Sequence, residues 1–372
     1  MNKKNIALTA IILLCWIFTG SVYAQETPDN IRGTIRSLDT SQLPLEKRFE
    51  WAQKEFKKSS KAGFYFTGYQ FLSRDKIHMG GNWRDDEPFK VSVKGEKIKV
   101  RMRSNRTDRS ESYETESGSA PAGLIFLHSF GASGEKITDM HILDMDRTYE
   151  FSETPIFWLG KADNNESITF LESELDGDKV NTKIQDSCVF AIYLHDHPQV
   201  CDRLYGIARG QYTRSIRKNA IFWIGNLRDE KSFKYLKAIL KETDDTQMKE
   251  HVIFALQLND TEQAIKELIQ IAKNDESRKV RKSAVFWLGQ KASKESVKAL
   301  KDMVEAPDED SDIKESAVFA IGQLPIDKAV PMLIDIAKTN TNPKVRKQAI
   351  FWLGQTGDSE ALKFFEDILL KK

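Results

Sequence analysis

Potential metal ligands and thiols gather in one short stretch, "CVFAIYLHDHPQVC" at residues 188–201. Cysteine sulfur and histidine nitrogen are ligands that zinc prefers, and Asp196 adds a carboxylate. Cys188 and Cys201 could instead form a disulfide bond, or remain two buried thiols. They are the only cysteines outside the N-terminal leader described below.

The place of this stretch in a repeated pattern favours the disulfide over the metal site. Alignment of the repeats puts Cys188 near the end of one helix and Cys201 near the start of the next. Antiparallel helices then bring the two cysteines to one level, where an oxidising compartment would join them. His195 and His197 fall in the turn between the helices, where we expect both to be exposed. We predict no metal ligand here.

Candidate catalytic residues are sparse in the rest of the chain. We find no phosphate-binding loop, nucleophile elbow or paired-carboxylate motif. The alternative that stays open is a metal-dependent or other enzyme with a site between the N-terminal sheet and the helical array, around His128, His141 and Asp144. The pattern itself predicts no catalytic residue and no cofactor.

The strongest pattern is a repeat of the motif "AIFWLGQ" at residues 349–355. Its phenylalanine recurs every 32 or 33 residues, at Phe157, Phe190, Phe222, Phe254, Phe286, Phe319 and Phe351. Apolar or small residues six and two positions before it, and Leu or Ile two positions after it, lie on one face of a helix. The glycine three positions after it suits a left-handed residue at a helix end.

A second helix is predicted in each repeat, with apolar residues again at helical spacing. Residues suited to cap it are Asn164, Asp229, Thr261, Ser293 and Asp358. Neither helix can bury its apolar stripe alone, so neighbouring pairs must stack. We therefore predict an all-α, right-handed superhelical solenoid of about seven helical hairpins over residues 151–372.

The last repeat, "NPKVRKQAIFWLGQTGDSEALKFFEDIL", resembles HEAT-like repeats of the phycobilisome-lyase type. The alternation of "FWLGQ" with "FAIGQLP" is further similar to a group of exported bacterial HEAT-repeat proteins. The resemblance implies the fold but no particular activity, because such repeats serve as scaffolds, inhibitors, lyases and hydroxylases. Deoxyhypusine hydroxylase, built from similar repeats, binds iron through repeated His-Glu pairs, and this chain has none.

The phenylalanine row allows two interpretations, because its side chains point away from the predicted core. The rings could stack from repeat to repeat as a ladder, or form an exposed ridge that a partner covers. The row, defined as the candidate partner-binding ridge, consists of Phe190, Phe222, Phe254, Phe286, Phe319 and Phe351. The tryptophans one position further on are expected to pack between repeats. The basic residues five positions before the phenylalanines are expected to bind carbonyls or acids of adjoining repeats. They are Arg217, Lys249, Arg281, Lys314 and Arg346.

Residues 25–150 lack the repeat and predict a small α+β domain that is mainly β. A short helix is expected at residues 43–58, and strands at 64–71, 89–104, 123–130 and 137–151. The polar stretch near 104–122 is expected to be a mobile loop.

The first 24 residues predict a signal peptide, with Lys3 and Lys4 before an apolar run too short to span a membrane. The mature chain is therefore expected in the periplasm or outside the cell, with no transmembrane segment. Its net charge is about −1, since 56 basic residues include those two lysines and 55 are acidic. That balance makes nucleic acid a poor partner. We predict a non-catalytic scaffold for an unknown protein or envelope component.

Overall fold

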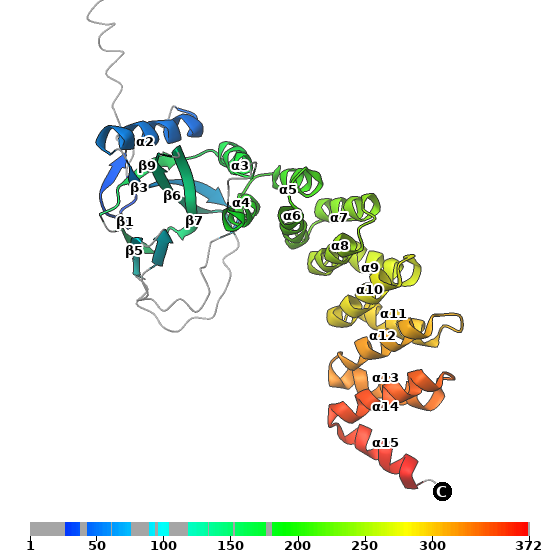
Figure 1. Cartoon of the computed structure of the whole chain (residues 1–372). Helices are drawn as coiled ribbons and strands as arrows, with labels where there is room; N and C mark the ends of the chain where they lie inside the picture. The colour runs from blue at the N-terminus through cyan, green and yellow to red at the C-terminus, as the bar shows by residue number, and fades with distance from the viewer. Residues whose placement is uncertain are drawn as a thin grey trace, which may run out of the picture. The chain divides into compact units, whose positions relative to one another are not determined.

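The computed structural model describes residues 27–37, 43–60, 62–75, 89–93, 96–103, 118–132, 134–151, 153–175 and 181–370. The predicted signal peptide and residues 104–117 of the predicted loop lie outside the described residues. The chain divides into two compact units, Met1–Val200 and Cys201–Lys372 (Figure 1). Each unit is described by itself.

Two β-sheets form the body of the first unit, in the orders β1-β8-β5-β4 and β2-β9-β3-β6-β7. The strands are β1 (Ile31–Arg32), β2 (Ile35–Ser37), β3 (Gly63–Ser73), β4 (Phe89–Val93), β5 (Glu96–Arg103), β6 (Ala120–Gly131), β7 (Gly134–Asp144), β8 (Thr148–Phe151) and β9 (Ile156–Lys161). Strands β3, β6 and β7 are antiparallel neighbours, whereas β9 runs parallel to β3. Side chains of both sheets, including Phe66, Ile125 and Tyr149, form one core.

Helices add to this sheet domain. They are α2 (Leu45–Ser59), α3 (Asn164–Ser173) and α4 (Thr182–Leu194). Helix α2 lies on the five-stranded sheet, where the ring of Phe56 stacks on Tyr65 with centroids 4.5 Å apart. Phe170 of α3 packs edge-on against Phe126 of β6, and Cys188 of α4 lies against Met140 of β7. These helices cover one face of the five-stranded sheet, and the four-stranded sheet covers the other.

The first predicted repeat is not a repeat. Residues 155–161, "PIFWLGK", contribute strand β9 instead of a helix, and Phe157 and Trp158 are both buried. Trp158 belongs to the core between the sheets, whereas Phe157 packs on Trp51 of α2. A strand that is covered on both faces needs a continuous apolar sequence, and this motif provides one. The same residue pattern that forms a helix in the later repeats therefore forms an inner strand here.

The second unit contains the helical repeats. Its helices are α5 (Val200–Arg209), α6 (Arg214–Asn226), α7 (Glu230–Glu242), α8 (Thr246–Asn259), α9 (Glu262–Asn274), α10 (Arg278–Lys291), α11 (Lys294–Glu305), α12 (Ser311–Gly322), α13 (Ile326–Thr339), α14 (Pro343–Thr356) and α15 (Ser359–Leu370). The even-numbered first helices, α6 to α14, lie side by side and closer together than the odd-numbered second helices. The predicted fold class, a helical-repeat solenoid preceded by a mainly β domain, is confirmed. None of the described helices is long and apolar enough to cross a membrane.

The predicted caps are confirmed where the repeat is present. The side chains of Asp229, Thr261 and Ser293 each accept a hydrogen bond from the third residue of their helix, and Asp358 accepts from the amide of Glu360. Asn164 is not a cap, because the repeat is absent there. Asp163 caps α3 instead.

The repeat glycines of these helices are not left-handed, which contradicts the prediction. Gly225 and Gly289 lie inside helices, and Gly322 is the last residue of α12. A Cβ added at Gly225 would lie 2.5 Å from the carbonyl oxygen of Ala255, and one at Gly289 would lie 2.9 Å from that of Ala320. The left-handed residues come three positions later, for example at Ala292. The glycine is therefore a site of close helix approach.

The structure predicts opposite effects for the same substitution at two repeat positions. Gly225→Ala should destabilise α6 and α8 by about 1–3 kcal/mol, because the clashing atom belongs to the backbone. Gly354→Ala in α14, with nothing within 4 Å of the added Cβ, should stabilise by about 0.5–1 kcal/mol. Thermal unfolding and hydrogen exchange of peptides from α6 and α14 would measure both. Destabilisation of similar size at both sites would support the original prediction that these glycines are left-handed residues at helix ends.

Candidate functional site

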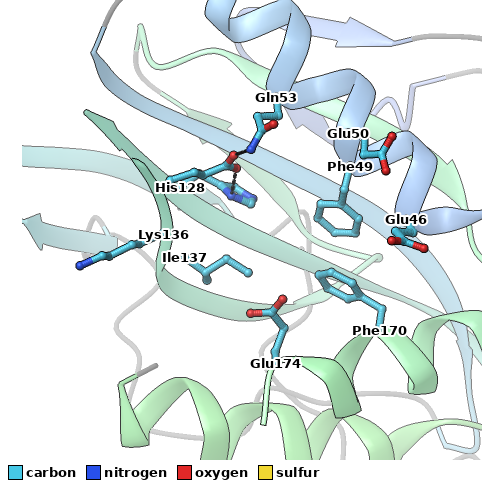
Figure 2. Close-up of a pocket in the computed structure, with 10 residues that line it drawn as sticks. Glu46, Phe49, Glu50, Gln53, His128, Lys136, Ile137, Phe170 and Glu174 are labelled. Carbon is cyan, nitrogen blue, oxygen red and sulfur yellow. Dashed lines mark hydrogen bonds and ion pairs between the residues drawn. The ribbon is translucent and has the colours of Figure 1, made fainter. Parts of the chain in front are cut away.

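A cavity of about 520 Å³ opens in the first unit beside helices α2 and α3 and the β6–β7 hairpin. Figure 2 shows side chains from all these elements directed toward it. The lining residues are Glu46, Phe49, Glu50, Gln53, His128, Glu135, Lys136, Ile137, Phe170 and Glu174. Four carboxylates and three apolar side chains thus surround a space of the size that small ligands occupy.

A polar network holds Glu135 at the wall of this cavity. Its Oε1 lies 2.9 Å from Nδ1 of His128, although the imidazole nitrogen is not aligned for a good hydrogen bond. Tyr65 donates its hydroxyl proton to the same carboxylate, and Gln53 donates from its amide. Burial opposes the charge, but the interactions with His128 and Tyr65 outweigh it and hold the pKa of Glu135 below its usual range. Glu135 is therefore a fixed negative charge.

His128 also contacts Thr67, whose Oγ1 lies 2.7 Å from Nε2 of the ring. Threonine, histidine and glutamate in this order are the parts of a nucleophile, base and orienting acid. Thr67 is completely buried and does not line the cavity. A substrate in the cavity could not reach its hydroxyl, so the arrangement is structural.

Glu174 stands at the cavity wall at the end of α3 and behaves differently. Burial and then the negative charge of Glu135 raise the pKa of Glu174. Among the described residues, no cation forms an ion pair with it. Lys136 also lines the cavity but points away from Glu174 in Figure 2. Two carboxyl groups of one cavity are thus pushed toward different protonation states.

The three residues named for the alternative enzyme site, His128, His141 and Asp144, have different partners within the first unit. His128 faces the cavity network, whereas Nε2 of His141 lies 3.2 Å from Asp139. Asp144 lies 3.3 Å from Arg147, and its amide donates to the hydroxyl of Tyr149. Only His128 of the three lines the cavity. Sequence reasoning missed Glu135 and Glu174, which belong to no motif.

The predicted disulfide is not formed. Cys188 and Cys201 are both buried and are not bonded to each other, and the sulfur of Cys188 lies 3.7 Å from that of Met140. Burial raises the pKa of the Cys188 thiol. Its position facing the sheet follows from the packing of α4 on β7.

His195 was expected in an exposed turn but is fully buried. Its ring stacks on Phe71, and its Nε2 lies 2.7 Å from the hydroxyl of Ser167. Nδ1 lies 2.6 Å from the carbonyl oxygen of Ala191, and burial lowers the pKa of His195 to about 4. A neutral, enclosed histidine of this kind joins α4 to α3. In the part of the chain that the structure describes, no cluster of three or more potential ligands could hold a metal ion.

The phenylalanine row in the second unit forms a chain of ring contacts along the first helices. Successive rings approach with centroids 4.8 to 6.3 Å apart, in the order Phe222, Phe254, Trp287, Phe286, Phe319, Trp352 and Phe351. Most of these rings are half-buried, and Phe351 is 53% exposed. In the first unit, Phe190 of α4 is likewise half-buried. The row is thus a ladder that still leaves ring surface accessible.

A hollow of about 560 Å³ lies beside this ladder at Phe254 and Trp287. Its other lining residues are Lys218, Gln247, Glu250, His251, Lys279 and Ser283. Lys279 pairs with Glu250 at 2.8 Å, and Nε2 of His251 lies 2.7 Å from the carbonyl oxygen of Lys218. The hollow is therefore an aromatic floor with a charged rim, in which the one acid of the lining pairs with one of its two lysines.

The basic residues five positions before the phenylalanines contact neighbouring backbone. Arg217 donates to the carbonyl of Ala208 at 2.9 Å, and Arg281 donates to that of Ala272 at 2.8 Å. Arg281 also pairs with Glu309. These two arginines link adjacent repeats, because their N–H groups donate to acceptors within the protein.

Replacement of Glu135 tests the polar network. Glu135→Gln should lower the free energy of unfolding of the first unit by about 1–3 kcal/mol at neutral pH, because buried partners lose their acceptor. Since the folded pKa of Glu135 is depressed, its contribution is present above the unfolded value of about 4.3 and is lost as pH falls through the folded value. The difference between variant and wild type should therefore shrink in acid, as unfolding curves at several pH values would show.

The matched control is Glu55→Gln, which removes a surface ion pair with Lys58 on the same helix as Gln53. We expect a change below about 0.5 kcal/mol. Equal effects of the two substitutions would rule out a structural role for the network.

One known protein family matches part of the second unit. A family model described as HEAT repeats matches residues 305–372. No curated protein sequence matches the chain. Human deoxyhypusine hydroxylase is 14% identical over 56% of this chain and 91% of its own, with a TM-score of 0.29. The CpcE–CpcF complex of phycocyanin lyase from Nostoc is 16% identical over 54% of this chain and 79% of that chain, with a TM-score of 0.30. Likeness at this level says nothing of activity. Residues 305–372 thus match HEAT repeats, and they lie in a second unit that is built of helix pairs.

Proposed function

We propose that the chain is a non-catalytic scaffold, exported to the periplasm or beyond, that holds a protein or envelope component on the layer of first helices. The observation that supports this most is the aromatic ladder, which runs over successive repeats and remains half-exposed beside the hollow at Phe254 and Trp287. Clustered aromatic side chains with a polar rim are typical of the centres of protein interfaces.

Ring contacts within the protein do not bury the ladder completely. The protein already makes ring contacts along the ladder, such as that between Phe222 and Phe254 with centroids 6.0 Å apart. The same rings nevertheless keep a surface that water covers at an energetic cost of about 25 cal/mol per Å². A partner that seats an apolar side chain in the hollow would remove that surface from water.

The charged rim indicates how much charge would contribute to the binding of such a partner. Lysines and acids of neighbouring first helices pair with each other, as Lys279 does with Glu250 and Lys282 with Asp312. Little net charge remains to attract a strongly acidic or basic partner. We therefore expect binding that depends weakly on salt and strongly on the aromatic side chains.

Site-specific crosslinking in the native host tests this proposal. A photocrosslinking residue replaces Ser283 in the hollow, and a second variant carries it at Lys234, an exposed position on α7. We expect one discrete adduct from position 283 and none from 234. Phe254→Ala should reduce that adduct about tenfold.

Tyr235→Ala is the control for lost stability. Tyr235 stacks on Tyr205 with centroids 4.0 Å apart, away from the ladder and on the second helices. Both substitutions remove a half-buried stacked ring and should cost about 1–3 kcal/mol. The adduct should survive Tyr235→Ala. An adduct equally sensitive to both, or formed equally from both positions, would contradict the proposal.

A further inference from the structure

The cavity of the first unit has an imbalance of charge that its own side chains do not correct. Glu135 is held as an anion by His128, Tyr65 and Gln53. Glu174 adds a second carboxyl at the same wall, and no described cation pairs with it. Titratable groups around Glu174 are Glu135 and Lys136 on β7, His128 on β6, Glu46 and Glu50 on α2, and Cys188 on α4.

The rest of the wall is apolar and half-buried. Phe49 of α2 and Phe170 of α3 stack with centroids 4.2 Å apart, and Ile137 of β7 lies next to them. Figure 2 shows the carboxyl of Glu174 directed between Ile137 and Phe170. An anionic end and an apolar surface thus belong to one cavity.

We propose that this cavity binds a primary alkylammonium group. The ammonium lies between Glu135 and Glu174, where its three N–H donors meet carboxylate oxygens. Among the described residues, no cation forms an ion pair with Glu174. The alkyl chain lies against Phe49 and Phe170. The inference concerns the first unit alone and does not depend on the scaffold proposed for the repeats.

Other ligand classes fit the same walls less well. A divalent metal needs several converging oxygen ligands, and no such group is present among the described residues. A neutral sugar would satisfy hydrogen bonds but leave a charged Glu174 without a cation. An anion would face four carboxylates, whereas the basic side chains among the lining residues are Lys136 and His128.

The pH dependence follows from the same groups. Glu174 has a raised pKa, so its carboxyl takes up a proton at a higher pH than an ordinary glutamate. Protonation removes one of the two charges that hold the ammonium. Affinity should therefore fall as the pH is lowered through the pKa of Glu174, and a bound amine should lower that pKa.

An NMR titration of the full mature chain with n-pentylammonium chloride, at constant ionic strength, tests the proposal. n-Pentanol is the uncharged ligand of matched shape. We expect pentylammonium to bind about tenfold more tightly than pentanol, and carbon NMR of the glutamate carboxyls to show the pKa of Glu174 falling on binding. Equal binding of the two ligands would overturn the proposal, and so would no binding of the amine.

Glu174→Gln should weaken pentylammonium about tenfold and abolish the pH dependence, while leaving pentanol unchanged. Glu360→Gln on α15 changes the net charge equally, outside the cavity, and should leave affinity within about twofold. Unchanged amine binding in Glu174→Gln would overturn the proposal. The comparison of the two ligands on the wild-type protein decides the question even if this variant does not fold.

Two sources could supply the ammonium, and a second ligand distinguishes them. Nα-acetyl-lysine N-methylamide presents the same group as a protein lysine does. Binding as tight as that of pentylammonium would identify a lysine side chain as the ligand. Binding of pentylammonium alone would identify a small free amine.

Discussion

The close contact between first helices, where Gly225 meets the backbone of Ala255, is the constraint on which the repeat unit depends. Removal of one side chain lets α6 and α8 approach until their backbones nearly touch, and Gly289 repeats this against Ala320. The first helices therefore lie closer together than the second helices. Phenylalanines that point away from the core are thereby brought into ring contact. The aromatic ladder is a consequence of helix spacing, and so is its half-exposure.

The sequence was sufficient to predict the repeat, its helix pairs and most of its caps, because these depend on local periodicity and on side chains such as Asp229 and Ser293. It was insufficient at residues 155–161, where almost the same letters form strand β9. Trp158 and Phe157 are buried on opposite faces of a sheet that is covered on both sides. Only the tertiary structure provides this cover. The role of Gly225 was missed for the same reason. A glycine near a helix end looks like a cap until the neighbouring helix is in place.

The cavity was not predictable from the sequence. Glu135 follows a hairpin turn and Glu174 ends a short helix, and neither position stands out among 55 acidic residues. Their significance comes from burial and proximity, since burial and then the charge of Glu135 raise the pKa of Glu174. His128 was noticed as a candidate, but its true partners are Thr67 and Glu135 and not the residues first grouped with it. The chain thus combines a polar cavity in its sheet domain with an aromatic surface on its repeats.

Hydroxyl-radical footprinting of the purified chain and of the chain in its native host tests the central claim most directly. The claim is that the half-exposed ladder is a surface for a partner. Phe254 and Trp287 should be oxidised in the purified protein and protected in the host, while Tyr235 on the second helices is oxidised equally in both. Equal oxidation of Phe254 in the two settings, with Tyr235 as the reference, would contradict the account and leave the ladder with a structural role only.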